Sequence, residues 1–159
     1  FATVQNYWHM LARGLEAEVG PFVKRSGMGV LPYHPLGGGY LTGKYVLGQE
    51  KPEGTRGAAG SGIIKTKESE HNYRLVQELT ALAADHGRPV AELAIAWLAA
   101  QPIVSSVIAG ASNPTQMLQN VAGASWELDA ETLASIDEIT APHGVPRQDV
   151  TPYIDRPGN

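Results

Sequence analysis

The stretch Tyr33–Tyr45, "YHPLGGGYLTGKY", sets three consecutive glycines among tyrosines and a lysine. It continues "GVLPY" (residues 29–33), a short apolar run typical of a buried strand, although Pro32 offers no N–H donor to a sheet. Residues 35–65 are Gly-rich and show no clear periodicity. Because so long an irregular segment in a compact domain is usually functional or disordered, we ask which ligand it holds.

Predicted strands and helices alternate around this stretch. The apolar, β-branched runs at residues 1–6, 29–33 and 105–110 indicate strands, and helical spacing appears in residues 14–25, 68–86, 90–101, 113–121 and after Asp129. Such alternation favours a parallel sheet with right-handed crossovers. Three strands that look buried on both faces leave two options: a small open α/β domain, or a consecutive part of a (β/α)8 barrel.

Composition narrows the function classes. A chain of 159 residues with 43% apolar and 18% charged residues is typical of one globular domain. Its net charge of -4 gives no reason to expect nucleic acid or an anionic membrane as partner. The absence of cysteine excludes disulfides and is compatible with a cytoplasmic location, which we expect. Because the chain starts at Phe1 directly in a predicted strand, we also expect that an upstream part is missing.

The segment from Gly110 to Asn120, "GASNPTQMLQN", is a second candidate ligand site. A predicted strand ends at Gly110, and the helix that follows begins with unbonded N–H groups, which can bind an anion. Gln116 and Asn120 lie four residues apart and share a helix face, where their amides could pair with the edge of a base such as adenine. The alternative is an ordinary strand–turn–helix connection with a good cap.

Three motifs together resemble the C-terminal half of an aldo-keto reductase. They are "VQNYW", "GVLPYHPLGGGYLTGKY" and "SSVIAGASNPTQMLQNVAGASWELDAETLASID", and the similarity runs from Phe1 to about Ile139. The family fold is a (β/α)8 barrel that binds NADPH. The resemblance implies an α/β fold: the C-terminal portion of a TIM barrel, with three parallel strands (the sixth to eighth) and flanking helices. We expect one partial-barrel unit over 1–159, made of a cofactor-binding half barrel (1–141) and a Pro-rich tail (142–159).

The same resemblance implies roles for individual residues. Gln5 would hydrogen-bond the nicotinamide carboxamide, and Tyr33 would stack on the nicotinamide ring. The segment that includes Pro35, Leu36, Gly37 and Gly39 would run along the pyrophosphate through backbone N–H groups, and Leu41 and Thr42 would continue that wall. The adenosine end would be held by Gly110, Ser112, Gln116 and Asn120. No Lys or Arg occurs between Arg88 and Arg147 to grip a 2′-phosphate, so NADP(H) is the expected cofactor and NAD(H) the alternative.

The chain is predicted to lack catalytic residues of its own. In the resembled family an Asp, Tyr, Lys and His set from the N-terminal half performs the chemistry, with the Tyr as proton donor. Tyr33, His34, Tyr40 and Lys44 are close in sequence, but packed tyrosines and a surface lysine explain them more simply than a new catalytic set. No metal is expected, since the histidines show no ligand spacing; those considered are His9, His71, His86 and His143.

Three functions remain open at this point. The favoured one is the cofactor-binding half of an NADP(H)-dependent reductase of small carbonyl substrates, inactive without a complementing N-terminal half. The second is a module that binds a dinucleotide without turning it over. The third is a self-assembling half barrel, a homo-oligomer whose copies cover each other's open sheet edges.

Overall fold

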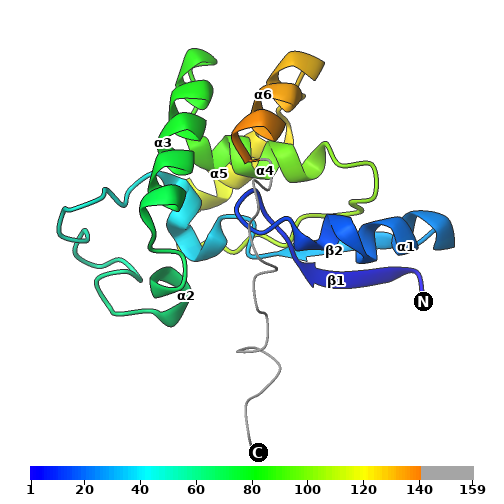
Figure 1. Cartoon of the computed structure of the whole chain (residues 1–159), viewed down its shortest axis with the longest axis horizontal. Coiled ribbons are helices and arrows are strands. Elements are labelled where there is room, and N and C mark those ends of the chain that lie inside the picture. The colour runs from blue at the N-terminus through cyan, green and yellow to red at the C-terminus, as the bar shows by residue number, and fades with distance from the viewer. Residues whose placement is uncertain (141–159) are drawn as a thin grey trace, which may run out of the picture.

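The computed structural model describes residues 1–140, and the predicted tail over 142–159 lies outside them (Figure 1). Two strands and eight helical segments follow one another along the described chain. They are β1 (Thr3–Tyr7), η1 (Gly14–Ala17), α1 (Val19–Ser26), β2 (Gly29–Tyr33), η2 (Gly37–Thr42), α2 (Gly62–Lys65), α3 (Glu70–Asp85), α4 (Val90–Ala99), α5 (Pro114–Ala124) and α6 (Ala130–Thr140). None of the helices in this described part is both long and apolar enough to cross a bilayer.

The sheet consists of β1 and β2, which run parallel with α1 as the crossover. Their register pairs Thr3 with Gly29 at one end and Tyr7 with Tyr33 at the other. Val30 is fully buried, and its neighbours in the strand are half-buried, so one face of β2 packs on the core. The first two predicted strands are therefore confirmed to within a residue or two at each end.

The third predicted strand, over residues 105–110, is wrong. Its segment meets β2 through two isolated parallel bridges, Val30–Val104 and Tyr33–Ile108. The offset between partners grows from 74 (104 − 30) at the first bridge to 75 (108 − 33) at the second, so the ladder slips by one residue. Pro32 explains the slip, because it has no N–H to continue the ladder; its carbonyl instead accepts from the Ile108 N–H at 2.9 Å.

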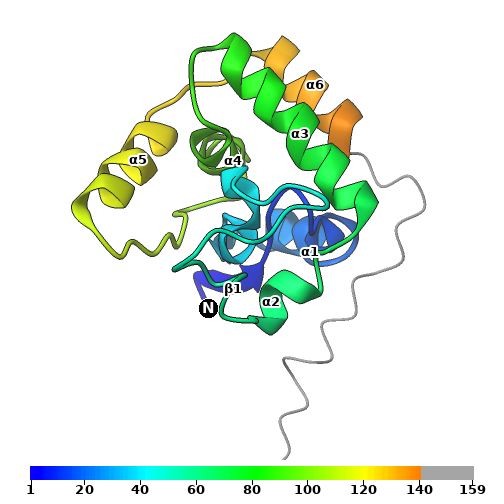
Figure 2. The same cartoon turned by 90° about the vertical axis from the view of Figure 1, so that its left-hand side faces the viewer.

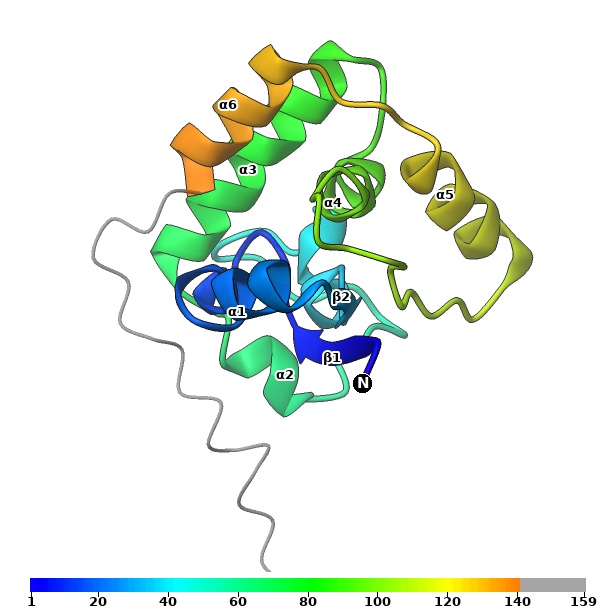
Figure 3. The same ribbon diagram turned by 90° about the vertical axis from the view of Figure 1, so that its right-hand side faces the viewer.

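The helices form a layer around α4. Almost every residue of α4 is buried, and its ends-on view in Figures 2 and 3 shows it lying between the α3–α6 pair and α5. The Trp97 ring of α4 packs edge-on against Trp8, which follows β1, with ring centres 5.5 Å apart. The core therefore joins the end of the sheet to the central helix through two buried indoles.

Prolines and caps set the helix limits. The helix predicted over residues 14–25 divides into η1 and α1, because the ring of Pro21 would clash with the carbonyl four residues earlier in a continuous helix. Ser69 caps α3 by accepting from the Asn72 N–H at 3.1 Å, and Gly87 follows its end in the left-handed conformation. Asn113 caps α5 by accepting from the Gln116 N–H at 3.0 Å. These two helices begin within two residues of their predicted starts, 68 and 113.

The contact between α4 and α5 depends on Gly123. A Cβ there would lie 2.9 Å from the Glu92 carbonyl oxygen and 3.0 Å from Ile95 Cβ, so Gly123→Ala forces the two helices apart. We expect a loss of about 1–3 kcal/mol in the free energy of unfolding, measured by urea denaturation. Gly62→Ala is the control, because nothing lies within 4 Å of its added Cβ. Equal stability of the two variants would contradict this close packing.

Candidate functional site

The carboxyl ends of β1 and β2 bring the predicted nicotinamide residues to one face of the sheet. Alternate residues of a strand share a face, and Tyr7 pairs with Tyr33, so Gln5, Tyr7 and Tyr33 point to the same side. The rings of Tyr7 and Tyr33 lie 5.6 Å apart. Gln5 is exposed and Tyr33 half-buried, whereas Val30 on the opposite face is buried in the core. The predicted carboxamide and stacking groups therefore share the open face.

The predicted pyrophosphate residues form a compact turn after β2. Pro35, Gly37 and Leu41 are buried, and Leu36, Gly39 and Thr42 are half-buried. Gly38 takes a φ of +72°, and a Cβ there would lie 2.5 Å from Ile63 Cγ2 of α2, so the turn packs tightly on that helix. A Cβ added at Gly39 would lie 3.5 Å from the Lys44 ammonium nitrogen. The turn therefore lies between a helix and an exposed cation.

Several N–H groups expected to face a pyrophosphate are bonded inside this turn. Gly37 N–H donates to the His34 carbonyl at 2.8 Å, and His34 itself takes a positive φ of 58°. Gly39 and Leu41 both donate to the Leu36 carbonyl, at 2.9 and 3.0 Å. The turn is thus held by its own backbone bonds, which give it one defined shape before any ligand arrives.

The predicted adenosine residues also lie together, at the start of α5. Gln116 accepts from the Ser112 N–H at 2.7 Å through its side-chain oxygen. Asn120 donates to the Gly110 carbonyl at 3.4 Å through its side-chain nitrogen. Both amides thus tie the helix to the preceding loop and keep part of their hydrogen-bonding capacity, because each amide carries two N–H donors and a two-lone-pair acceptor. The four residues predicted to share this end therefore form two hydrogen-bonded pairs, Ser112 with Gln116 and Gly110 with Asn120.

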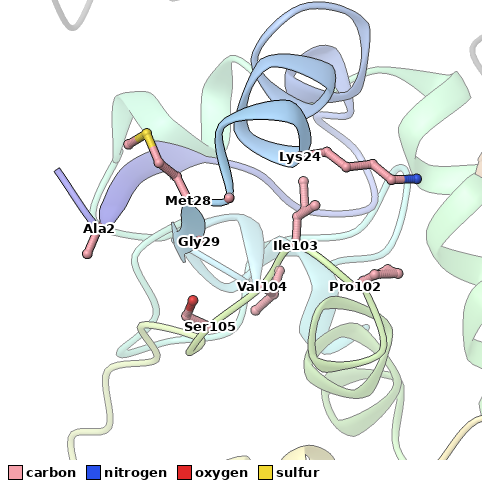
Figure 4. Close-up of a pocket in the computed structure, with 9 residues that line it drawn as sticks. Ala2, Lys24, Met28, Gly29, Pro102, Ile103, Val104 and Ser105 are labelled. Carbon is pink, nitrogen blue, oxygen red and sulfur yellow. The ribbon is translucent and has the colours of Figure 1, made fainter.

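The surface has two hollows, of which one includes a predicted site residue and the other does not. One, of about 360 Å³, lies between α4, α5 and residues 104–109 and includes Asn120. The other, of about 400 Å³, is lined by Ala2, Gly29 and Ser105 among others, with Lys24 beside it (Figure 4). Because Gly29 begins β2, this second hollow lies at the end of the sheet opposite to Tyr33 and is not part of the candidate site.

A buried cluster that the sequence did not reveal lies beneath the glycine turn. His9 is fully buried, and its Nε2 lies 2.7 Å from the Tyr7 hydroxyl, while its Nδ1 accepts from the Leu11 N–H at 3.2 Å. Lys67 is only 4% exposed, and its ammonium lies 5.2 Å from the centre of the Tyr7 ring. Because alternate residues of a strand share a face, the position of Gln5 in the first strand already indicates that Tyr7 lies on the side of the site. The sequence around Lys67, "IIKTKESE", resembles an ordinary charged surface and gave no signal.

The remaining predicted groups agree with a structural role. Tyr40 is buried and stacks on Tyr45, and burial raises the pKa of its hydroxyl, the wrong direction for a proton donor at neutral pH. Lys44 is exposed. Within residues 1–140, no group of three or more His, Cys, Asp or Glu side chains is placed to hold a metal ion.

Residues 1–141 match the aldo/keto reductase family model. The chain belongs to the aldo/keto reductase family. It is 32% identical over 137 residues to Protein tas of Escherichia coli K12, a match that covers 86% of this chain and 39% of that protein. It is 32% identical over 124 residues to the L-glyceraldehyde 3-phosphate reductase of Escherichia coli O157:H7, covering 75% of this chain and 35% of that protein.

A solved structure agrees with this assignment. The glycerol dehydrogenase of Gluconobacter oxydans superimposes with a TM-score of 0.73 at 25% identity, over 92% of this chain and 45% of that chain. The fold is therefore α/β and matches part of an aldo/keto reductase barrel. This aldo/keto reductase chain spans 35% to 45% of the length of these relatives.

The buried His9 makes the stability of this aldo/keto reductase chain depend on pH. Burial, with smaller effects of Lys67 and His34, holds the pKa of His9 well below 6.5, so the folded state keeps it neutral. Below pH 6.5, His9 binds a proton in the unfolded chain but stays neutral in the folded chain. The free energy of unfolding therefore falls as the pH falls. The expected slope approaches about 1.4 kcal/mol per pH unit. Urea unfolding at several pH values from 7.5 to about 4.5 measures it, and His9→Gln should flatten the curve in that range; an unchanged slope would contradict this.

Proposed function

We propose that this chain forms the cofactor-binding part of an NADP(H)-dependent carbonyl reductase. It would supply the C-terminal portion of a (β/α)8 barrel, with the segment at residues 104–108 in the place of the third strand. The observation that supports this best is the shared open face of Gln5 and Tyr33 at the carboxyl edge of the sheet. Ligands of barrels and open α/β sheets bind at this edge.

The nicotinamide end of the site has groups of matching chemistry. The side-chain amide of Gln5 is exposed and can both donate to and accept from a carboxamide. The Tyr33 ring offers an aromatic face, held in place by contacts with the rings of Tyr7 and His34. When bound, the nicotinamide supplies the hydride. Gln5 and Tyr33 would fix which face of that ring is presented to a carbonyl substrate.

The parts of the site proposed to hold the phosphates and the adenosine carry few positive charges. The self-bonded turn places the Lys44 ammonium beside Gly39, where it can attract a pyrophosphate. Ser112 and the first turn of α5 offer hydroxyl and N–H donors to the adenosine side. Because no Lys or Arg lies between Arg88 and Arg147, a 2′-phosphate finds fewer positive charges there, and NAD(H) is the alternative cofactor.

The proton donor of the proposed reaction comes from outside this chain. Tyr40 and Lys44 do not form a substitute pair, since Tyr40 is buried with its hydroxyl pKa raised and Lys44 is exposed. The chain alone is therefore inactive in this proposal, and its partner is a complementing N-terminal half barrel; association with a second copy belongs to the self-assembling alternative. The substrate is a small carbonyl compound, the location is cytoplasmic, and neither nucleic acid nor membrane takes part.

Cofactor binding can be measured on this chain by quenching of tryptophan fluorescence with NADPH and NADH. We expect Gln5→Ala and Tyr33→Ala each to weaken binding by about tenfold, the loss of one hydrogen bond or stacking contact. Gln77→Ala on α3 is the matched control, because it removes an exposed glutamine far from the sheet edge in sequence and should change nothing. Absence of quenching at millimolar cofactor would contradict the proposal.

Catalysis can be tested by complementation. Mixing this chain with an N-terminal half barrel of an aldo/keto reductase should restore NADPH-dependent reduction of aromatic aldehydes, whereas neither half alone should turn over. Cofactor binding without any restored activity would favour the dinucleotide-binding module. Sedimentation of this chain by itself measures self-association, and a stable monomer would argue against the self-assembling half barrel.

A further inference from the structure

Lys67 is a buried cation without a carboxylate partner in the described part of the chain. Its ammonium donates to the Ile63 carbonyl at 3.4 Å, a long hydrogen bond, and faces the Tyr7 ring. The nearest acids in sequence are engaged elsewhere, since Glu68 pairs with Lys51 and Glu70 with Arg74. A buried ammonium with unused donors costs free energy unless an acceptor completes it.

The groups around Lys67 add no negative charge. His9 accepts from the Leu11 N–H through Nδ1, which places the proton on Nε2 and leaves the ring neutral. His34 has its pKa lowered by burial and then by the charges of Arg56 and Lys67. Burial likewise lowers the pKa of Lys67 to about 8, so it stays mostly charged at neutral pH. Neither histidine therefore carries a charge that would neutralise the Lys67 ammonium.

The position of Lys67 connects this cation to the candidate nicotinamide site. The Tyr7 ring contacts both the Lys67 ammonium, at 5.2 Å, and the Tyr33 ring, at 5.6 Å. A Cβ on Gly37 would lie 3.4 Å from Lys67 Cε, so the glycine turn closes directly over this side chain. The ammonium thus lies one aromatic ring away from the ring on which the nicotinamide is proposed to stack.

We propose that Lys67 receives the anionic group, a carboxylate or a phosphate, of a small carbonyl substrate whose carbonyl lies against the nicotinamide that is proposed to stack on Tyr33. This inference rests on the proposed function and narrows its substrate class to anionic carbonyl compounds. The anion would accept the ammonium donors that the long bond to Ile63 leaves unused, and would offset the cost of the buried charge. Because the nearby acids pair with other cations, the Lys67 ammonium favours an anionic substrate over a neutral or cationic one.

The test is a titration of the full 159-residue chain with inorganic phosphate and, separately, with acetate at constant ionic strength. Affinity is read from the rise in thermal midpoint and by calorimetry. Lys67→Met should weaken binding by about 10- to 100-fold, the effect of losing a charge-assisted hydrogen bond. Lys67→Arg should keep most of the affinity. Lys65→Met is the matched control, since Lys65 lies two residues away and is exposed.

The outcomes separate this inference from the proposed function. If Lys67→Met still shows quenching by NADPH but no longer binds phosphate or acetate, the anion site is distinct from the cofactor site. Stronger binding of phosphate or of acetate then indicates whether the anionic group of the substrate is a phosphate or a carboxylate. Displacement of phosphate by NADPH would assign the anion to the cofactor and overturn the inference, as would equal anion binding by Lys67→Met and the unchanged chain. Absent NADPH binding in all variants would instead remove the proposed function.

Discussion

The parallel pairing of β1 with β2, and the proline within β2, determine how the candidate site is built. The register sets Tyr7 beside Tyr33 and puts Gln5 on the same face. Pro32 takes one donor away from the other edge of β2, so residues 104–108 approach it irregularly, with a one-residue slip. The chain then turns sharply at His34 in the left-handed conformation and enters the self-bonded glycine turn. The nicotinamide and pyrophosphate parts of the candidate cofactor site therefore both begin at the carboxyl end of this short sheet.

The elements whose signals are local could be predicted from the sequence. The first two strands and the starts of α3 and α5 depend on β-branched runs and on Ser69 and Asn113 as caps, all visible within a few residues. The third strand failed because its pairing depends on a proline some seventy residues earlier in the chain. The break between η1 and α1 was visible in principle, because Pro21 excludes a continuous helix there.

The candidate site likewise contains residues that the sequence could predict and residues that it could not. Gln5 and Tyr33 and the cluster around Gln116 lie in motifs, and the structure brings the members of each end together. The N–H groups of the glycine turn donate to carbonyls of the same turn. This depends on the backbone angles, and three consecutive glycines allow many such angles, so the sequence does not specify them. Lys67 is the clearest omission, since a lysine in a charged stretch becomes a buried one through contacts with a strand sixty residues away.

The open face of the sheet leaves room for a cofactor but does not shield the reaction from water. β1 has a strand neighbour on one side in the described chain, and Gln5 on its outer face is exposed, so a nicotinamide placed there would face water. Exclusion of water strengthens the electrostatic interactions on which hydride transfer to a carbonyl depends. Exposed apolar residues on α5, namely Met117, Leu118 and Val121, need cover as well. A segment that covered both surfaces would stabilise the fold and would also exclude water from the reaction site.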